Sequence, residues 1–184
     1  MSTNYENVVL GSGWLYASPV SAITDVFALT TTEAAALVNI GYIESSAKLS
    51  TKSKATFATA ANAGKVKRCE GDKEVAFETG IISWELDNVA KFLTGSTYAE
   101  ADGVKTFTYA NSDTAPIVFL RFIYEDQTDN RKVTIDMYRC QFTGELELDF
   151  NKKDPVTFDY AFDLLAKNNG TKNVYFNIKE EALA

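Results

Sequence analysis

Hydrophobic and polar side chains alternate along several stretches of this chain of 184 residues. The longest alternating stretch runs from Lys132 to Phe150, and a second runs from Lys73 to Trp84. Because successive side chains of a β-strand point to opposite faces of a sheet, a period of two predicts strands with one apolar face. In the second stretch Phe77 lies on the apolar face and Glu78 on the opposite, partly acidic face. This patterning constrains the chain to a fold made mainly of β-sheet.

Shorter segments in the same region follow this pattern. Ile117 to Tyr124 is predicted to be a buried strand, and Lys105 to Ala110 a shorter one. The polar residues Asp126 to Asn130 are predicted to form a hairpin turn. Near Gly144 the phase of the longest stretch is interrupted, which indicates a bend or a bulge.

Two more alternating stretches lie near the C-terminus, from Val156 to Leu164 and from Val174 to Ile178. The dipeptide Asn169-Gly170 stands between them, and both of its residues accept a positive φ, so a C-terminal β-hairpin or a closely related connection is predicted. A helical phase from Phe158 to Leu165 is the competing interpretation.

Two segments have helical features. Apolar residues from Leu86 to Leu93 recur with helical spacing, and Gly95 follows where a left-handed cap is common. Thr30 and Glu33 have the spacing of a capping box at the start of a short helix. We therefore predict an N-terminal arm over residues 1–13 and one domain over residues 14–184. Its expected fold is a β-sandwich or partly rolled barrel with one flanking helix and a second short helix.

The stretch from Lys48 to Ala60 is unusual because Leu49 and Phe57 are its only large apolar residues. The preceding stretch, Ile40 to Glu44, is also predicted to be extended. Strands made of Lys, Ser, Thr and Ala cannot fill a hydrophobic core. We expect the Lys48–Ala60 strand to lie at a sheet edge, or on a surface that a partner covers.

The composition excludes several classes of protein. The formal charge is −7, from 25 acidic and 18 basic residues, which argues against a nucleic-acid reader because such proteins neutralise phosphates with Lys and Arg. No secretory signal and no long apolar stretch is present, so we expect a cytosolic product without membrane insertion. Cys69 and Cys140 are expected to be reduced thiols.

The motifs of common enzymes are missing. The sequence has no histidine, so Ser-His-Asp and Cys-His pairs cannot form and zinc loses its main nitrogen ligand. Gly11-Ser12-Gly13 lacks the rest of a dinucleotide fingerprint, and the Asp126–Asn130 turn lacks the spacing of a calcium loop. We therefore expect no enzyme, no cofactor and no metal site.

Two groups of residues leave other functions open. Glu145, Glu147 and Asp149 share one strand face with a spacing of about 7 Å between neighbours, and two such carboxylates could serve a glycosidase. A solvated strand face is the favoured explanation. Trp14 and Trp84 could stack on sugars in a carbohydrate-binding or virion decoration domain, but we favour packing in the core or at an interface.

The order of these segments resembles that of the major tail tube proteins of bacteriophages, over roughly residues 38–180. The segments that carry the resemblance are Ile40–Glu44, the polar strand Lys48–Thr59, the turn Gly64–Arg68, the strand Glu74–Trp84, the helix Glu85–Leu93, and an ending that runs from Asp154-Pro155 through Leu164–Ala166 to Asn169-Gly170. The N-terminal arm and the Thr94–Asp113 insertion lie outside the resemblance.

The resemblance implies a structural role in a virion tail, after synthesis in the host cytoplasm. Six copies would close into a ring, and rings would stack into a hollow tube whose acidic lining repels the DNA that it conducts. The implied partners are further copies, DNA and the tape-measure protein in the lumen without specific binding, tail terminator and baseplate proteins, and a sheath in contractile tails. A pilin-like or secreted ring protein is a close variant.

Two sets of residues are assigned to the surfaces of such a tube. The candidate lumen-facing residues are the carboxylates Glu74, Glu78, Glu145, Glu147 and Asp149. The candidate inter-subunit residues belong to the polar strand and the basic segment after it, and they are Lys48, Ser50, Lys52, Lys54, Thr56, Lys65, Lys67 and Arg68. The N-terminal arm and a predicted loop from Ala60 to Gly71 are the candidates for contacts between rings.

Overall fold

The computed structural model describes residues 12–43, 47–60, 64–81, 86–92, 96–109, 115–143 and 158–183. These residues form a mainly β structure with little helix, as predicted. The strands are β1 (Gly13–Pro19), β2 (Val38–Ile43), β3 (Ala47–Ala60), β4 (Gly64–Ile81), β5 (Thr97–Ala101), β6 (Val104–Thr108), β7 (Ile117–Asp126), β8 (Arg131–Phe142), β9 (Phe158–Leu164), β10 (Lys167–Asn168), β11 (Asn173–Val174) and β12 (Phe176–Ala182). The helical elements are a 3₁₀ turn (Val20–Ala22), α1 (Thr31–Ala35) and α2 (Leu86–Phe92).

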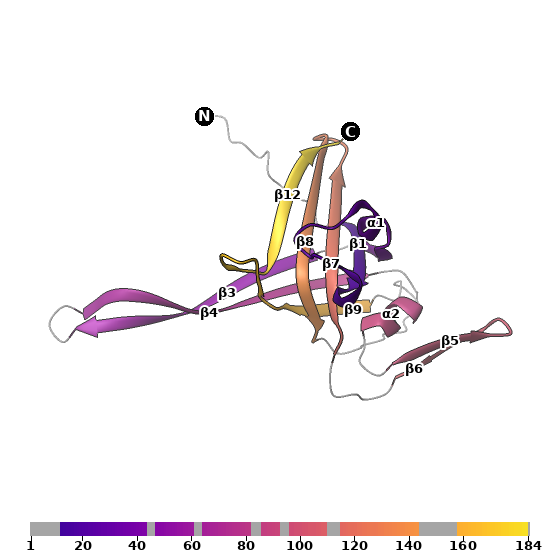
Figure 1. Ribbon diagram of the computed structural model, residues 1–184, viewed down its shortest axis with the longest axis horizontal. Helices are drawn as coiled ribbons and strands as arrows, with labels where there is room; N and C mark the ends of the chain where they lie inside the picture. The colour runs from indigo at the N-terminus through magenta and orange to yellow at the C-terminus, as the bar shows by residue number, and fades with distance from the viewer. Residues whose placement is uncertain are drawn as a thin grey trace, which may run out of the picture.

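Most strands belong to one antiparallel sheet of order β2-β1-β7-β8-β9-β4-β3. On the side of β8 away from β7, residues 131–137 pair with β12 and residues 140–142 pair with β9. Figure 1 shows β7, β8 and β12 running upward and β3, β4 and β9 crossing them, so that β8 joins two layers. Among the described strands the sheet has open edges at β2, β3 and β12 and does not close. The prediction of a mainly β sandwich is confirmed.

The two layers share one hydrophobic core. Along β4 the alternation directs Val75 and Phe77 inward, where both side chains are almost fully buried, and Glu78 outward, as predicted. Phe77 packs near Phe122 of β7, with 6.4 Å between the ring centroids. The inward face of β4 therefore fixes this strand to the opposite layer.

Helix α2 is the flanking helix that the sequence predicts. Its Phe92 is buried and lies edge-to-face against Phe162 of β9, with 5.5 Å between the ring centroids. The buried Asn88 side chain donates a hydrogen bond of 3.2 Å to the carbonyl oxygen of Asn39 in β2. These contacts attach the helix to both β9 and β2.

The capping box of the short helix α1 is also confirmed. Glu33 accepts hydrogen bonds from the backbone N–H groups of Thr24 (2.6 Å) and Thr30 (2.8 Å), and its own N–H donates to the Thr30 hydroxyl. These bonds lower the pKa of Glu33 to about 2, and the bond from the N–H of Thr24 has the largest effect. The segment that they order covers Phe119 and Tyr138, the centre of a second, smaller apolar cluster on the outer face of the β7–β8 pair.

The predicted turn over Asp126–Asn130 is confirmed, because β7 ends at Asp126 and β8 begins at Arg131. The Asp126 carboxylate accepts a hydrogen bond of 2.9 Å from the N–H of Thr128. Asn130 has a φ of 50°, a value that Asn tolerates better than most residues. The bend predicted at Gly144 lies outside the described residues.

The predicted C-terminal hairpin is wrong in its pairing. Both strands exist, and β9 excludes the helical alternative, but β9 pairs with β4 and β8 while β12 pairs with β8. Only the two-residue strands β10 and β11 form a hairpin around Gly170, whose φ is 91°. The turn at Asn169-Gly170 was correctly predicted, but the long strands on its two sides pair with other strands of the sheet.

Candidate assembly interface

The two longest strands form a hairpin that extends well beyond the rest of the sheet. β3 and β4 pair up to Ala60 and Gly64, whereas β4 pairs with β9 only from Ala76 to Ile81. Figure 1 shows the resulting projection at one end of the molecule. We call Ser53–Ala60 together with Gly64–Lys73 the arm. About ten residues of β4 give it a length of about 30 Å, at ~3.3 Å per residue.

The prediction of a loop from Ala60 to Gly71 is wrong, because β4 already begins at Gly64. Residues 61–63, which connect the two strands, lie outside the described residues. The basic run in this segment forms a strand because its backbone pairs with β3, and backbone pairing does not require apolar side chains. Opposite residues in the register are Thr59 and Lys65, Ala58 and Lys67, and Phe57 and Arg68.

The polar strand lies at a sheet edge, as predicted, because β3 is the last strand of the sheet in the described ranges. It pairs with β4, from Ala47 opposite Thr79 to Ala60 opposite Gly64. Among the candidate inter-subunit residues, Lys48 and Lys52 are exposed and Ser50 is half-buried. The others lie on these two strands, with side chains outside the described set: Lys54, Thr56, Lys65, Lys67 and Arg68.

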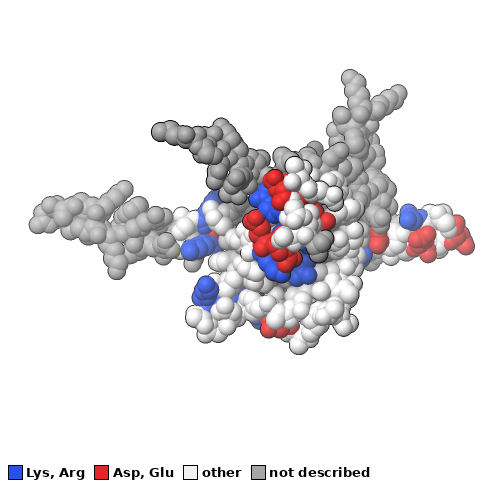
Figure 2. All heavy atoms as spheres, turned by 90° about the horizontal axis from the view of Figure 1, so that it is seen from above, with Lys and Arg blue, Asp and Glu red and all other residues white. Residues whose placement is uncertain are grey.

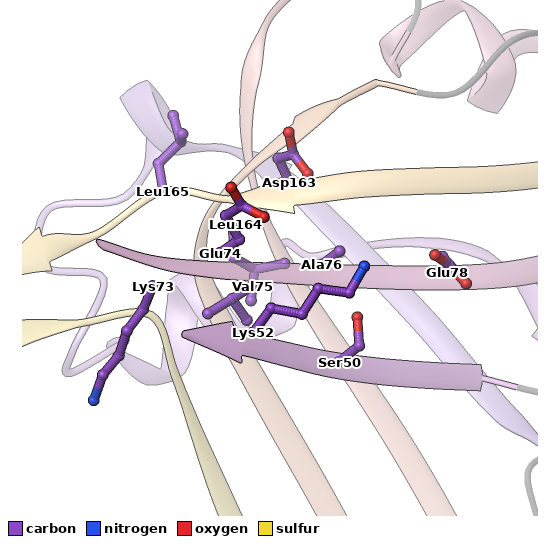
Figure 3. A pocket seen from close by; sticks show the side chains of 10 residues that line it. All are labelled: Ser50, Lys52, Lys73, Glu74, Val75, Ala76, Glu78, Asp163, Leu164 and Leu165. Carbon is purple, nitrogen blue, oxygen red and sulfur yellow. The ribbon is translucent and has the colours of Figure 1, made fainter. Parts of the chain in front are cut away.

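The outward face at the base of the arm carries both signs of charge. Lys48 Nζ lies 3.1 Å from Glu78 Oε2, and Lys52 stands opposite Glu74 in the register. Lys52, Glu74 and Glu78 line a shallow pocket of about 390 Å³ together with Asp163 of β9, as Figure 3 shows. The face of Glu74 and Glu78 is therefore not uniformly acidic. The exposed Lys48–Glu78 pair contributes at most about 1 kcal/mol to stability.

An exposed aromatic pair lies at the other end of the sheet. Trp14 of β1 and Tyr42 of β2 stand opposite each other, edge-to-face, with ring centroids 5.1 Å apart. Their exposed fractions are 43% and 38%. The prediction that Trp14 packs in the core is therefore wrong, because the alternation of β1 turns Leu15 inward and Trp14 outward. Trp84 lies outside the described residues, as do Glu145, Glu147 and Asp149.

A second projecting hairpin, β5–β6, was not predicted as a hairpin. Its turn residues are Asp102 and Gly103, with φ values of 52° and 78°. Asp-Gly is a strong signal for a two-residue hairpin turn and could have identified it. Figure 1 shows this hairpin projecting at the end of the molecule opposite to the arm. Val104 is 63% exposed, as is Tyr109 just after β6.

The half-buried Arg121 and Asp136 form an ion pair between β7 and β8. Nε and Nη2 of Arg121 donate hydrogen bonds of 2.5 and 2.8 Å to the two carboxylate oxygens of Asp136, which raises the pKa of Arg121. Burial raises the pKa of the Cys140 thiol and of the Tyr160 hydroxyl. Within the described ranges, no group of three or more His, Cys, Asp or Glu residues could hold a metal ion. No helix in these ranges is long and apolar enough to span a membrane.

The most distinctive surfaces of the described chain are thus the β3 edge with its arm, the β5–β6 hairpin and the Trp14–Tyr42 pair. All three project toward solvent from a well-packed core. Comparison of the sequence with models of protein families, and separately with curated proteins, found no match.

Proposed function

We propose that this chain is a structural subunit that assembles with copies of itself into stacked hexameric rings and so forms a tail tube of the bacteriophage type. The observation that carries the proposal is the arm, a two-stranded ribbon of about 30 Å that no other described strand accompanies. An isolated pair of strands is at best marginally stable in water. A neighbouring copy that pairs with the arm would supply the missing stability.

The edge of β3 supports this proposal. An unpaired edge strand exposes a row of backbone N–H and C=O groups that can accept another strand. Lys48 and Lys52 are exposed beside this edge, and such charges disfavour indiscriminate aggregation. β3 therefore combines a backbone ready to pair with side chains that limit pairing to a complementary surface.

The charge of the chain also suits a conduit for DNA. A ring of six copies carries six times the formal charge of −7 and repels phosphate. In the proposal, the face that bears Glu74 and Glu78 looks into the lumen, with Glu145, Glu147 and Asp149 as the second candidate set. Lys48 and Lys52 reduce the negative potential of the first face, so the repulsion of the passing DNA is expected to be weaker than the formal charge alone would give.

In this role the chain is not an enzyme and belongs to the virion tail. Its partners would be further copies in the same and neighbouring rings, the DNA and tape-measure protein in the lumen, and the terminator and baseplate proteins at the tube ends. A contractile tail would add a sheath around the outside.

Electron microscopy of the purified protein in negative stain tests the proposal. We expect hollow rods with regular striations for the wild-type chain at high concentration. A variant in which residues 55–70 are replaced by Asn-Gly should remain folded by circular dichroism but form no rods. The matched control, Glu125→Gln on the turn side of β7, should form rods normally. Wild-type protein that stays monomeric at about millimolar concentration would contradict the proposal.

A carbohydrate-binding or virion decoration domain is the second candidate, and the exposed Trp14–Tyr42 pair favours it. Exposed aromatic rings offer flat apolar faces, on which the apolar faces of sugars can stack. A glycan array with the wild-type chain and with Trp14→Ala tests this candidate. Binding that is lost in Trp14→Ala, by a protein that remains monomeric, would favour it over the tube.

A further inference from the structure

The arm and the β5–β6 hairpin lie at opposite ends of the molecule, as Figure 1 shows. Two copies can bring these different surfaces together in an antiparallel pair, which is closed after two copies, or head-to-tail. The head-to-tail contact leaves one arm and one hairpin free at the ends of the pair, so it repeats with further copies until a ring closes or a filament grows. A head-to-tail contact between the two ends would therefore produce the rings that the proposed function requires.

The two ends carry charges of opposite sign. From Ser53 to Lys73 the sequence has five basic and two acidic residues, although the whole chain has a net charge of −7. The β5–β6 hairpin has Glu100 and Asp102 against Lys105, and all three are exposed. Figure 2 shows the acidic side chains at the outer end of this hairpin. Complementary charge favours contact between unlike ends and disfavours contact between like ends.

The β5–β6 hairpin contacts the main core through Phe107 near its base, but no other described strand pairs with it. β5 and β6 form a separate two-stranded sheet, which pairs with no other described strand. Val104 exposes 63% of its surface, and Tyr109 exposes the same fraction beside the hairpin. Large apolar side chains on a two-stranded ribbon gain stability when a partner covers them.

We propose that the β5–β6 hairpin of one copy docks on the basic arm of the next copy. Glu100 and Asp102 face the basic residues of the arm, and Val104 supplies the apolar part of the contact. This inference rests on the proposed self-assembly, and it identifies which two surfaces of the chain meet. It assigns the arm to a neighbouring copy rather than to nucleic acid, because the copy carries complementary charge and the chain as a whole is acidic.

Charge exchange combined with sedimentation velocity tests the contact. Glu100→Lys/Asp102→Asn and Lys65→Glu/Lys67→Glu should each raise the dissociation constant for assembly about tenfold or more. A mixture of the two variants should assemble again, because each then offers the charge that the other needs. The wild-type assembly should weaken when NaCl is raised from about 50 to about 500 mM, because salt screens exposed charges.

Controls separate this contact from general effects of charge and folding. Glu125→Lys/Asp129→Lys makes a comparable change in net charge at the exposed β7–β8 turn and should leave assembly unchanged. Glu100→Gln/Asp102→Asn avoids a second lysine opposite Lys105 and should still weaken assembly, with an unchanged thermal melting curve.

Three results would overturn the docking. Wild-type assembly that is indifferent to the Glu100 and Lys65 variants would reject this contact and leave self-assembly standing. A wild-type chain that never assembles would reject both proposals. Binding of the wild-type chain to a DNA duplex of about 20 base pairs, lost in Lys65→Glu/Lys67→Glu while assembly is unchanged, would assign the arm to nucleic acid instead.

Discussion

Phe77 provides a sharp test of how the arm is attached to the body. Its side chain is 1% exposed and packs against the opposite layer near Phe122. Phe77→Ala removes a buried ring and leaves a cavity, which costs about 3–5 kcal/mol. For a chain of this length, each kcal/mol lowers the melting temperature by about 2–4 °C, so a decrease of about 6–20 °C is expected. Phe77→Leu keeps most of the volume and should cost clearly less.

Urea denaturation followed by far-UV circular dichroism measures the free energy of unfolding, at concentrations where the midpoint does not depend on protein concentration. Glu78→Ala is the matched control, because Glu78 is the next residue of β4 but is exposed and forms an exposed ion pair with Lys48. It should cost about 1 kcal/mol or less. A Phe77→Ala cost as small as that of Glu78→Ala would refute the shared core and the anchoring of the arm.

Three further predictions concern the rest of the fold. Glu33→Gln should lower the free energy of unfolding at neutral pH. The difference from wild type should shrink as the pH falls below 4.5, the ordinary pKa of Glu, and vanish near pH 2, because the folded-state pKa of Glu33 is lowered to about 2. A difference that stays constant with pH in chemical denaturation would contradict this. Gly13→Ala should lower the melting temperature markedly, because a Cβ atom there would lie 2.4 Å from the backbone oxygen of Ile123, whereas Ser12→Ala should have little effect. In a Cys69→Ser background, Cys140 should react with a thiol reagent at pH 8 only on unfolding, because its thiol is fully buried and its pKa is raised; rapid labelling of the native protein would show that β8 opens.

The strands that could be predicted are those with one buried face. In β4, the alternation of Val75 and Phe77 with Glu74 and Glu78 correctly predicted the part of the strand from Lys73 to Ile81 and both of its faces. The polar composition of Lys48–Ala60 indicated an edge for a physical reason, since a strand without large apolar residues contributes little to a core. In both cases the burial pattern along a single strand was enough.

Pairing between distant strands could not be predicted in the same way. The alternation in β9 and β12 predicts which face of each strand is buried, but it does not predict which strand each one pairs with. Their pairing partners are determined by the packing of both layers. The basic segment from Gly64 to Gly71 has no alternation of apolar and polar residues, so its strand structure depends on pairing with β3. Trp14 shows the same limit, because only the phase of β1 within the sheet decides that it faces outward.

The way in which β4 continues from the arm into the sheet has a mechanical consequence. Tension along the arm is transmitted to the six residue pairs that join β4 to β9, from Ala76–Asp163 to Ile81–Phe158. Because the load acts along the strand direction, these pairs share it and must slide together rather than open one after another. A subunit with this connection resists extraction by its arm, which is useful in any object that must survive pulling or bending.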